Sequence, residues 1–243
     1  RVLLDKEYKP DYNIGFPAKR ITTQLEWEDM VLDYQVAIEL EEINVWISSG
    51  KTVMEDWGLS RILKAGYRSL FYGSPGTGKT LAATLLGKKN EIDVYRIDLS
   101  MIVSKYIGET EKNLAKVFDL AENRNWILFF DEADALFGKR TSTNTSNDRH
   151  ANQEVAYLLQ RIEDFPGMVI LATNLRSNID EAFSRRFQSV VYFPMPTEEQ
   201  RAELWRNMLP GKWLGKDAEE LITMAAETEL SGGAITNVVR RCA

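Results

Sequence analysis

Hydrophobic residues recur along this chain in two different patterns, and each pattern predicts its own kind of element. Short apolar runs bounded by polar or glycine-rich segments predict strands. The five runs are Arg68–Tyr72, Val94–Leu99, Ile127–Phe130, Met168–Ala172 and Val190–Phe193. Helical patterns separate most of these runs, so the sequence predicts an α/β fold with a parallel sheet and helices on both faces.

Apolar residues at helical spacing mark the predicted helices. One pattern precedes the first strand, others lie between strands, and the rest follow the last strand. They cover Glu28–Ile47, Leu81–Leu86, Glu111–Glu122, Asn152–Ile162, Thr197–Leu209, Asp217–Glu227 and the segment after Gly233. Thr197, with Glu199 and Gln200 close behind it, suits a helix start.

The strands stop after the segment FPMP, Phe193–Pro196, and this change divides the chain. We expect an extended lead-in over residues 1–20, an αβα domain over 21–195 and a small helical domain over 196–243. The chain stops within the last helical pattern, so the helical domain is expected to be incomplete at its C-terminus. The polar segment TSTNTSND, residues 141–148, cannot build a core and predicts a flexible loop.

Composition and charge limit the function classes. The 243 residues are 44% hydrophobic and 27% charged, typical of a soluble globular protein. The formal net charge is −6, so long-range attraction to nucleic acid or to an anionic membrane is not expected. No apolar run reaches the roughly 18 residues of a membrane span, and the first residues, RVLLDKEYKP, lack the apolar core of a secretory signal.

The scarcity of cysteine and histidine excludes several kinds of site. Cys242 is the single cysteine and His150 the single histidine. No disulfide can form within the chain, which suits a reducing compartment, and we expect a cytoplasmic protein. A zinc cluster of cysteine and histidine ligands and an HExxH protease site are excluded, and no nucleophile motif supports a triad with His150.

The segment GSPGTGKT, Gly73–Thr80, matches the phosphate-binding pattern GxxxxGK[ST], also called Walker A. Its glycines let backbone N–H groups turn toward phosphate oxygens, and the helix that follows adds the dipole of its N-terminus. Lys79 would bring positive charge to the β- and γ-phosphates, and Thr80 would offer its hydroxyl to Mg²⁺. We therefore predict a P-loop that binds a nucleotide through Ser74, Pro75, Gly76, Thr77, Gly78, Lys79, Thr80 and Leu81.

Two carboxylates, Asp131 and Glu132, follow the buried strand that begins at Ile127. An aspartate at the carboxyl end of such a strand can reach the Mg²⁺ shell beside the phosphate loop. The neighbouring glutamate can orient and deprotonate the attacking water. A strand-end turn with solvated acids would look the same in isolation, but the phosphate loop upstream favours the catalytic interpretation.

Four segments in order, GSPGTGKT, ILFFDEAD, LATN and SRRF, make the chain resemble an AAA+ ATPase from roughly Ile21 to the C-terminus. Within that superfamily it resembles the AAA-proper branch that includes katanin and spastin. The resemblance implies a three-layer αβα core followed by a helical lid, and Mg²⁺-dependent hydrolysis of ATP. It also implies a ring of identical subunits, most often a hexamer, in which a neighbour completes each site in trans.

The resemblance gives roles to further residues. Asn174, in LATN, matches the sensor that holds the attacking water and the γ-phosphate. Arg185 and Arg186 match the arginine fingers that reach the γ-phosphate of the neighbouring subunit. The region is shorter than the R-x-G-R-F form of the family, so which arginine is the finger stays open. Tyr106 and Ile107, in KYIGE, match the pore loop that grips an unfolded polypeptide, although a buried turn would suit the same pair.

The lid segment departs from many AAA+ proteins, because SGGAITNV carries Thr236 where they carry an arginine. In the AAA-proper branch small residues approach the base instead, so Gly233 and Ala234 are expected near adenine. Asp29–Val31 matches the segment that usually lies on the adenine side.

Three hypotheses for the use of the ATP remain: a motor that remodels, disassembles or threads proteins, a nucleotide-gated assembly scaffold, and a nucleic-acid motor or loader. Tyr106 and the acidic balance favour a protein substrate, and no clustered basic face supports nucleic acid. The segments GFPAKR, FDEADALFGKR and DRHANQEVAYLLQRIE resemble bacterial AAA proteins, including ones encoded with contractile injection systems. In that setting the substrate would be a tail-tube or sheath component.

Overall fold

A computed structural model describes residues 18–99, 109–134, 146–174, 184–209 and 217–242. Among these residues, one sheet has the strand order β1-β3-β4-β5-β2-β6. Its strands are β1 Ala18–Ile21, β2 Tyr67–Gly73, β3 Val94–Asp98, β4 Ile127–Asp131, β5 Met168–Thr173 and β6 Ser189–Phe193. All five predicted strands are present, and β2 to β6 pair in parallel.

The sequence predicts an extended lead-in over residues 1–20 and identifies no strand before Arg68, so it misses β1. β1 pairs antiparallel with β3, with Ala18 opposite Ile97, and makes the sheet mixed rather than wholly parallel. Arg20 fixes the pairing further, since its Nε donates a hydrogen bond to Asp93 at 2.9 Å. A four-residue edge strand with a single buried residue has too little hydrophobic pattern to be recognised from the sequence.

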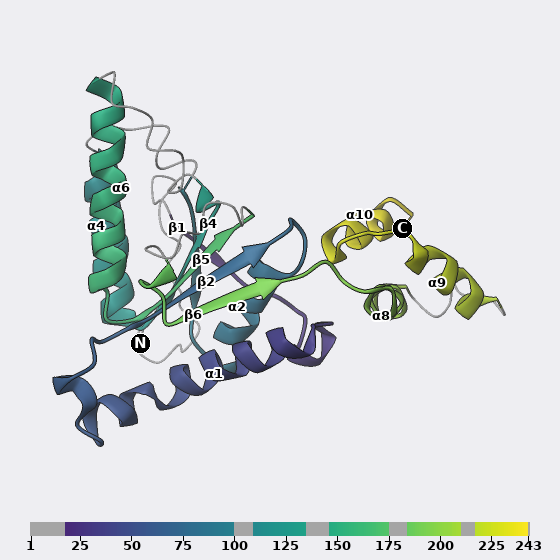
Figure 1. Ribbon diagram of the computed structural model, residues 1–243, viewed down its shortest axis with the longest axis horizontal. Helices are drawn as coiled ribbons and strands as arrows, with labels where there is room; N and C mark the ends of the chain where they lie inside the picture. Colours follow the sequence, from purple (N-terminus) through teal and green to yellow (C-terminus); the bar gives the residue numbers. More distant parts are fainter. Residues whose placement is uncertain (1–17, 100–108, 135–145, 175–183, 210–216, 243) are drawn as a thin grey trace, which may run out of the picture.

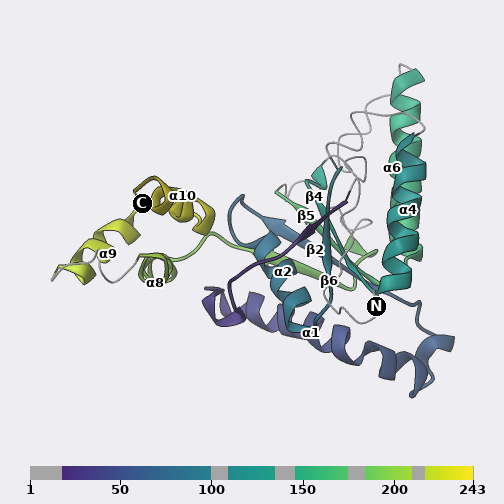
Figure 2. The same cartoon turned by 180° about the vertical axis from the view of Figure 1, so that it is seen from behind.

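Helices cover both faces of the sheet (Figures 1 and 2). α1 (Tyr34–Glu55) and α2 (Lys79–Lys89) lie on one face, and α4 (Glu109–Arg124) and α6 (Ser146–Asp164) lie on the other. Alternate residues of β4 serve the two hydrophobic cores: Phe129 packs with α1 and α2, and Phe130 packs with α4 and α6. The predicted three-layer α/β fold is therefore confirmed.

The first helix begins and ends later than the sequence predicts. It runs from Tyr34 to Glu55, whereas the hydrophobic pattern suggests Glu28 to Ile47. The Asp33 carboxylate accepts a hydrogen bond from a backbone N–H of the first turn at 2.9 Å and so sets the start. The preceding residues instead form a short 3-10 turn and an extended segment, which later prove to line the site.

The polar segment 141–148, predicted as a flexible loop, is in part helical. α6 already begins at Ser146, so residues 146–148 belong to its first turn, and residues 141–145 lie outside the described part of the chain. Serine, asparagine and aspartate favour both loops and helix starts, so composition alone could not separate the two.

After β6 the described residues form three short helices, called the lid from here on: α8 (Glu198–Met208), α9 (Ala218–Glu227) and α10 (Gly232–Cys242). They share a small core of Trp205, Ile222, Ala226 and Ile235. Thr197 starts α8 with a capping box closed by Gln200, as its sequence suggests. In both views the lid stands beyond the carboxyl ends of the strands (Figures 1 and 2). None of the described helices is long and apolar enough to cross a membrane.

Candidate nucleotide-binding site

The glycine loop joins β2 to α2 at the carboxyl edge of the sheet, and its backbone requires glycine. Gly76 and Gly78 have φ angles of +76° and +103°, a region that other residues rarely adopt. A Cβ on Gly76 would lie 2.5 Å from the Ser231 hydroxyl, and one on Gly78 would lie 2.9 Å from the Met30 methyl group. The loop is therefore a close-fitting backbone cradle of the kind that binds phosphate groups.

Lys79 lies inside this cradle and is only 8% exposed. Its Nζ donates hydrogen bonds to the carbonyl oxygens of Gly73 and Ser74, at 2.7 and 2.9 Å. Burial lowers the pKa of the Lys79 ammonium to about 8, and the negative charges of Asp131 and Asp134 oppose this shift. A buried cation held by two neutral carbonyls fits an anionic ligand, because phosphate oxygens would compensate its charge better than carbonyl dipoles do.

Asp131 ends β4 beside the loop and is held from two directions. Arg96, on the neighbouring strand β3, places Nη2 2.8 Å from the Asp131 Oδ2. The backbone N–H of Glu132 donates a hydrogen bond to the Asp131 Oδ1 at 3.0 Å. Oxygen ligands such as the Asp131 carboxylate and the Thr80 hydroxyl are those that Mg²⁺ prefers, so these residues fit the ion expected with ATP.

Glu132 has a left-handed backbone conformation, with φ at +54°, which is uncommon for a residue other than glycine. The conformation places an exposed carboxylate at the turn that follows a strand whose first four residues are buried. Strained residues of this kind persist only where neighbouring contacts hold them, and they occur often at functional sites.

One cavity of about 480 Å³ unites most of the predicted site residues. This volume lies within the range of small-molecule sites. The residues predicted from the sequence that line it are Pro75, Gly76, Thr77, Gly78, Lys79, Thr80, Leu81, Asp131, Glu132, Asn174 and Gly233. Ser74 contributes to the same loop through its carbonyl bond to Lys79.

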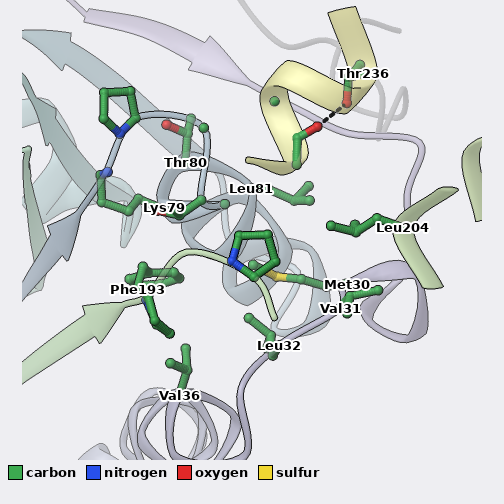
Figure 3. A pocket seen from close by; sticks show the side chains of 18 of the residues that line it. Met30, Val31, Leu32, Val36, Lys79, Thr80, Leu81, Phe193, Leu204 and Thr236 are labelled. Carbon is green, nitrogen blue, oxygen red and sulfur yellow. Dashed lines mark hydrogen bonds between the residues drawn. The ribbon is translucent and has the colours of Figure 1, made fainter. Parts of the chain in front are cut away.

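Apolar side chains close the other side of the cavity (Figure 3). Met30 and Leu32 come from the segment before α1, Phe193 from the end of β6 and Leu204 from α8. The sequence pointed to Asp29–Val31 here but missed the other residues, because they have the spacing of ordinary core positions. A slot lined by apolar side chains next to a phosphate cradle fits a flat base attached to phosphates.

The remaining predicted residues lie away from the cavity lining or outside the described chain. Ala234 follows Gly233 in α10, and its N–H donates a hydrogen bond to the Ser231 hydroxyl at 3.3 Å. Arg185 and Arg186 are exposed, and Arg186 forms an ion pair with Glu163 at the end of α6. Tyr106 and Ile107 lie outside the described residues.

The family model described as "ATPase family associated with various cellular activities (AAA)" matches residues 69–195, more than half of the chain. The chain belongs to the AAA family. This match covers the phosphate loop, both acidic residues, Asn174 and the two arginines, and it confirms the identification of an AAA+ ATPase domain from the sequence.

Two curated proteins and one crystal structure illustrate the relatives of this AAA chain. Cell division protein C of Sulfolobus acidocaldarius is 42% identical over 146 residues, which are 56% of this chain and 38% of that protein. Proteasome-activating nucleotidase of Archaeoglobus fulgidus is 36% identical over 172 residues, 68% of this chain and 43% of that protein. The FIGL-1 AAA domain superposes with a TM-score of 0.69 at 24% identity, over 93% of this chain and 74% of that one, and confirms the fold. The chain thus spans less than half the length of these two curated relatives.

Proposed function

We propose that this AAA chain is a Mg²⁺-dependent ATPase that works as a ring-shaped motor on protein substrates. The observation that carries the proposal is the convergence of the phosphate loop, Asp131, Glu132 and Asn174 on one cavity with an apolar slot. These are the groups that phosphoryl transfer to water requires: a cradle for phosphate, a site for the metal, a base and a sensor of the transferred group.

Each residue has a distinct task in this proposal. The loop N–H groups and Lys79 bind the phosphates, and Met30, Leu32 and Leu204 enclose the base. Mg²⁺, when bound beside Thr80 and Asp131, would neutralise charge that develops on the phosphates. Glu132 takes a proton from the attacking water, and Asn174 orients that water toward the γ-phosphate.

Arg185 and Arg186 support assembly into a ring, most simply a hexamer. A finger arginine must reach the charge of the transferring phosphoryl group, yet neither arginine is among the residues that line the cavity of its own chain. In a ring built by one repeated head-to-tail contact, these exposed arginines would serve the cavity of the next subunit.

The proposed load is protein rather than nucleic acid. The net charge of −6 argues against a polyanion, and relatives named as proteasome-activating nucleotidases support protein handling. Tyr106 and Ile107 are the residues proposed to grip the polypeptide. A tail-tube or sheath component of a contractile injection system stays a prediction for the load, supported only by the resemblance of the sequence.

Light scattering on the Glu132→Gln variant, with and without Mg²⁺-ATP, tests the proposal. Without its base the variant should keep ATP bound, because the phosphate loop is intact, and it should shift from a monomer to a particle of ring size. The Lys79→Ala variant is the matched control and should stay monomeric at the same ATP concentration. A Glu132→Gln protein that binds ATP and stays monomeric would contradict the ring.

A further inference from the structure

The turn after Glu132 is joined to the end of β5 by the carboxylate of Asp134, whose hydrogen bonds have no role in the proposed chemistry. The Oδ1 atom of Asp134 accepts a hydrogen bond from the Thr173 hydroxyl and a second from the Asn174 backbone N–H, the latter at 3.2 Å. Thr173 is 1% exposed, so its hydroxyl meets this carboxylate inside the protein. One oxygen therefore holds the last residue of β5 and the residue that follows it.

A backbone contact strengthens the same connection. The N–H of Ala133 donates a hydrogen bond to the carbonyl oxygen of Ala172 at 2.9 Å. The regular pairing of β4 with β5 ends at Phe130 opposite Leu171, so these contacts prolong the link between the two strands beyond their ladder. The turn and the end of β5 are thereby joined at three successive residues of β5 and its continuation.

Glu132 and Asn174 stand on the two sides of this connection. Glu132 precedes Ala133 directly and has its left-handed conformation there, while Asn174 donates its own N–H to Asp134. The proposed function needs both side chains to act on one water molecule, and catalysis depends steeply on such relative placement. A side chain that holds both segments can therefore control the rate without touching the nucleotide.

We infer that Asp134 is a positioning residue of the ATPase reaction, which fixes Asn174 relative to Glu132 through its bonds to Thr173 and to the Asn174 N–H. This inference rests on the proposed function. Asp134 is not among the residues that line the cavity, whereas Glu132 and Asn174 are. Asp134 therefore acts through the placement of Glu132 and Asn174. It should therefore affect turnover far more than nucleotide binding.

Three substitutions separate the bonds of Asp134 from its charge. Asp134→Ala removes the acceptor, Thr173→Val removes one donor at nearly constant shape, and Asp134→Asn keeps an oxygen acceptor while removing the charge. We expect Asp134→Ala to lower kcat by roughly 10- to 100-fold, with ATP affinity within about threefold of the unmodified protein. Asp134→Asn should keep kcat within about threefold, and Thr173→Val should lie between the two.

A double substitution and a distant control complete the experiment. Adding Thr173→Val to Asp134→Ala should cause no further loss of kcat, because both remove the same bond. Asp119→Ala, which removes a carboxylate from the outer face of α4 where it pairs with Arg161, should leave kcat unchanged. Nucleotide affinity and the unfolding temperature are measured for every variant, so that a folding defect is seen as such.

The turnover of these variants distinguishes a failure of the proposed function from a failure of the inference about Asp134. Absence of turnover in the unmodified protein contradicts the proposed function and the inference together. Normal turnover in the unmodified protein and in Asp134→Ala contradicts the inference alone. If Asp134→Asn is as slow as Asp134→Ala, the charge of Asp134 matters and its positioning bonds do not. If Asp134→Ala does not fold, Thr173→Val and Asp134→Asn give the same decision, and an unchanged kcat in Thr173→Val overturns the inference.

Discussion

The charged ammonium group of Lys79 is almost completely shielded from solvent, since the residue is only 8% exposed. Its ammonium contacts two carbonyl oxygens of its own loop, and burial is the main cause that lowers its pKa from 10.5 to about 8. Asp131 and Asp134 limit this shift by their charge. A phosphate group in the cradle would oppose the shift more strongly, since an opposite charge in contact favours the charged form of the lysine.

Nucleotide affinity should therefore fall as the pH rises above about 8. The free protein loses the Lys79 proton near that pH, whereas the complex keeps it, so binding must take up a proton in the window between the two pKa values. We expect affinity to fall by up to about tenfold per pH unit in that window, measured by calorimetry of ADP binding in EDTA. Lys79→Ala should remove the dependence, and an affinity that is constant from about pH 7 to about pH 9.5 would contradict the prediction.

The site residues that the sequence identifies form their contacts with near neighbours in the sequence, whereas the residues that it missed form contacts with residues far away in the sequence. Lys79 and Thr80 are recognisable because a phosphate loop is built from consecutive residues, so its residue spacing can be read from the sequence without knowledge of the fold. Arg96 was not predicted as the partner of Asp131, because their contact depends on how β3 pairs with β4. Leu204 contacts the cavity from α8, and on the sequence it looks like any apolar helix position.

At the scale of elements, the most consequential contact joins the phosphate loop to the first turn of α10. The N–H of Gly233 donates a hydrogen bond to the carbonyl oxygen of Gly76 at 2.9 Å. A Cβ on Gly233 would lie 3.0 Å from the Gly76 Cα, whereas a Cβ on Gly232 would meet its nearest neighbour, the Gly76 oxygen, at 3.6 Å. The backbones of the loop and the lid are thus in direct contact at Gly233, which leaves little room for a side chain. At Gly232 a Cβ would fit at an ordinary van der Waals distance.

Gly233→Ala should weaken nucleotide binding, and Gly232→Ala should not. The added methyl group at Gly233 would meet the Gly76 Cα at 3.0 Å, so α10 and the loop must shift apart at the edge of the cavity. We expect an ATP affinity lower by roughly 5- to 20-fold. Fluorescence titration with a labelled ADP measures both variants. The two substitutions add the same group to the first turn of α10, so equal losses in both would show that the close contact at Gly233 is not responsible.

The elements themselves were predicted well where hydrophobic pattern and length were sufficient. β4 and β5 are continuous apolar runs buried on both faces, which is the pattern of central parallel strands. β1 carries no such pattern, since it is short and lies at the edge. The start of α1 was misplaced because Met30 and Leu32 continue the helical spacing, although they belong to a non-helical segment that lines the cavity and packs against the core. In this segment, residues that line a cavity and residues of an amphipathic helix have the same hydrophobic spacing.

At the scale of the whole molecule, the cavity lies where the carboxyl edge of the sheet meets the lid, while the proposed fingers lie elsewhere. Arg186 is paired with Glu163 at the end of α6, and α6 covers the opposite face of the sheet from α1 and α2 (Figure 1). Neither arginine lines the cavity of its own chain. A single subunit would then have every proposed group for binding and proton transfer, yet lack the charge that completes phosphoryl transfer.

Mixing two inactive variants tests whether a neighbour supplies that charge. Glu132→Gln keeps the arginines and loses the base, whereas the double variant Arg185→Ala, Arg186→Ala keeps the base and loses the fingers. If the arginines act in trans, a double-variant subunit whose cavity faces a Glu132→Gln neighbour regains a complete site. Random assembly at equal amounts should then restore about a quarter of the turnover of the unmodified protein.

A second mixture separates this restoration from a general effect of assembly. Glu132→Gln combined with Asn174→Ala places both defects in the cavity and leaves both phosphate loops intact, so both variants can enter the ring. Neither subunit can complete the other, and turnover should stay at the level of the separate variants. Turnover of the first mixture is measured by phosphate release after the subunits have exchanged. If it equals only the mean of its two components, the arginines do not act across subunits. Restoration confined to the first mixture supports arginines that act in trans. Arg185→Ala and Arg186→Ala are then each mixed with Glu132→Gln. The finger is the arginine whose single substitution abolishes turnover and whose variant regains turnover in this mixture.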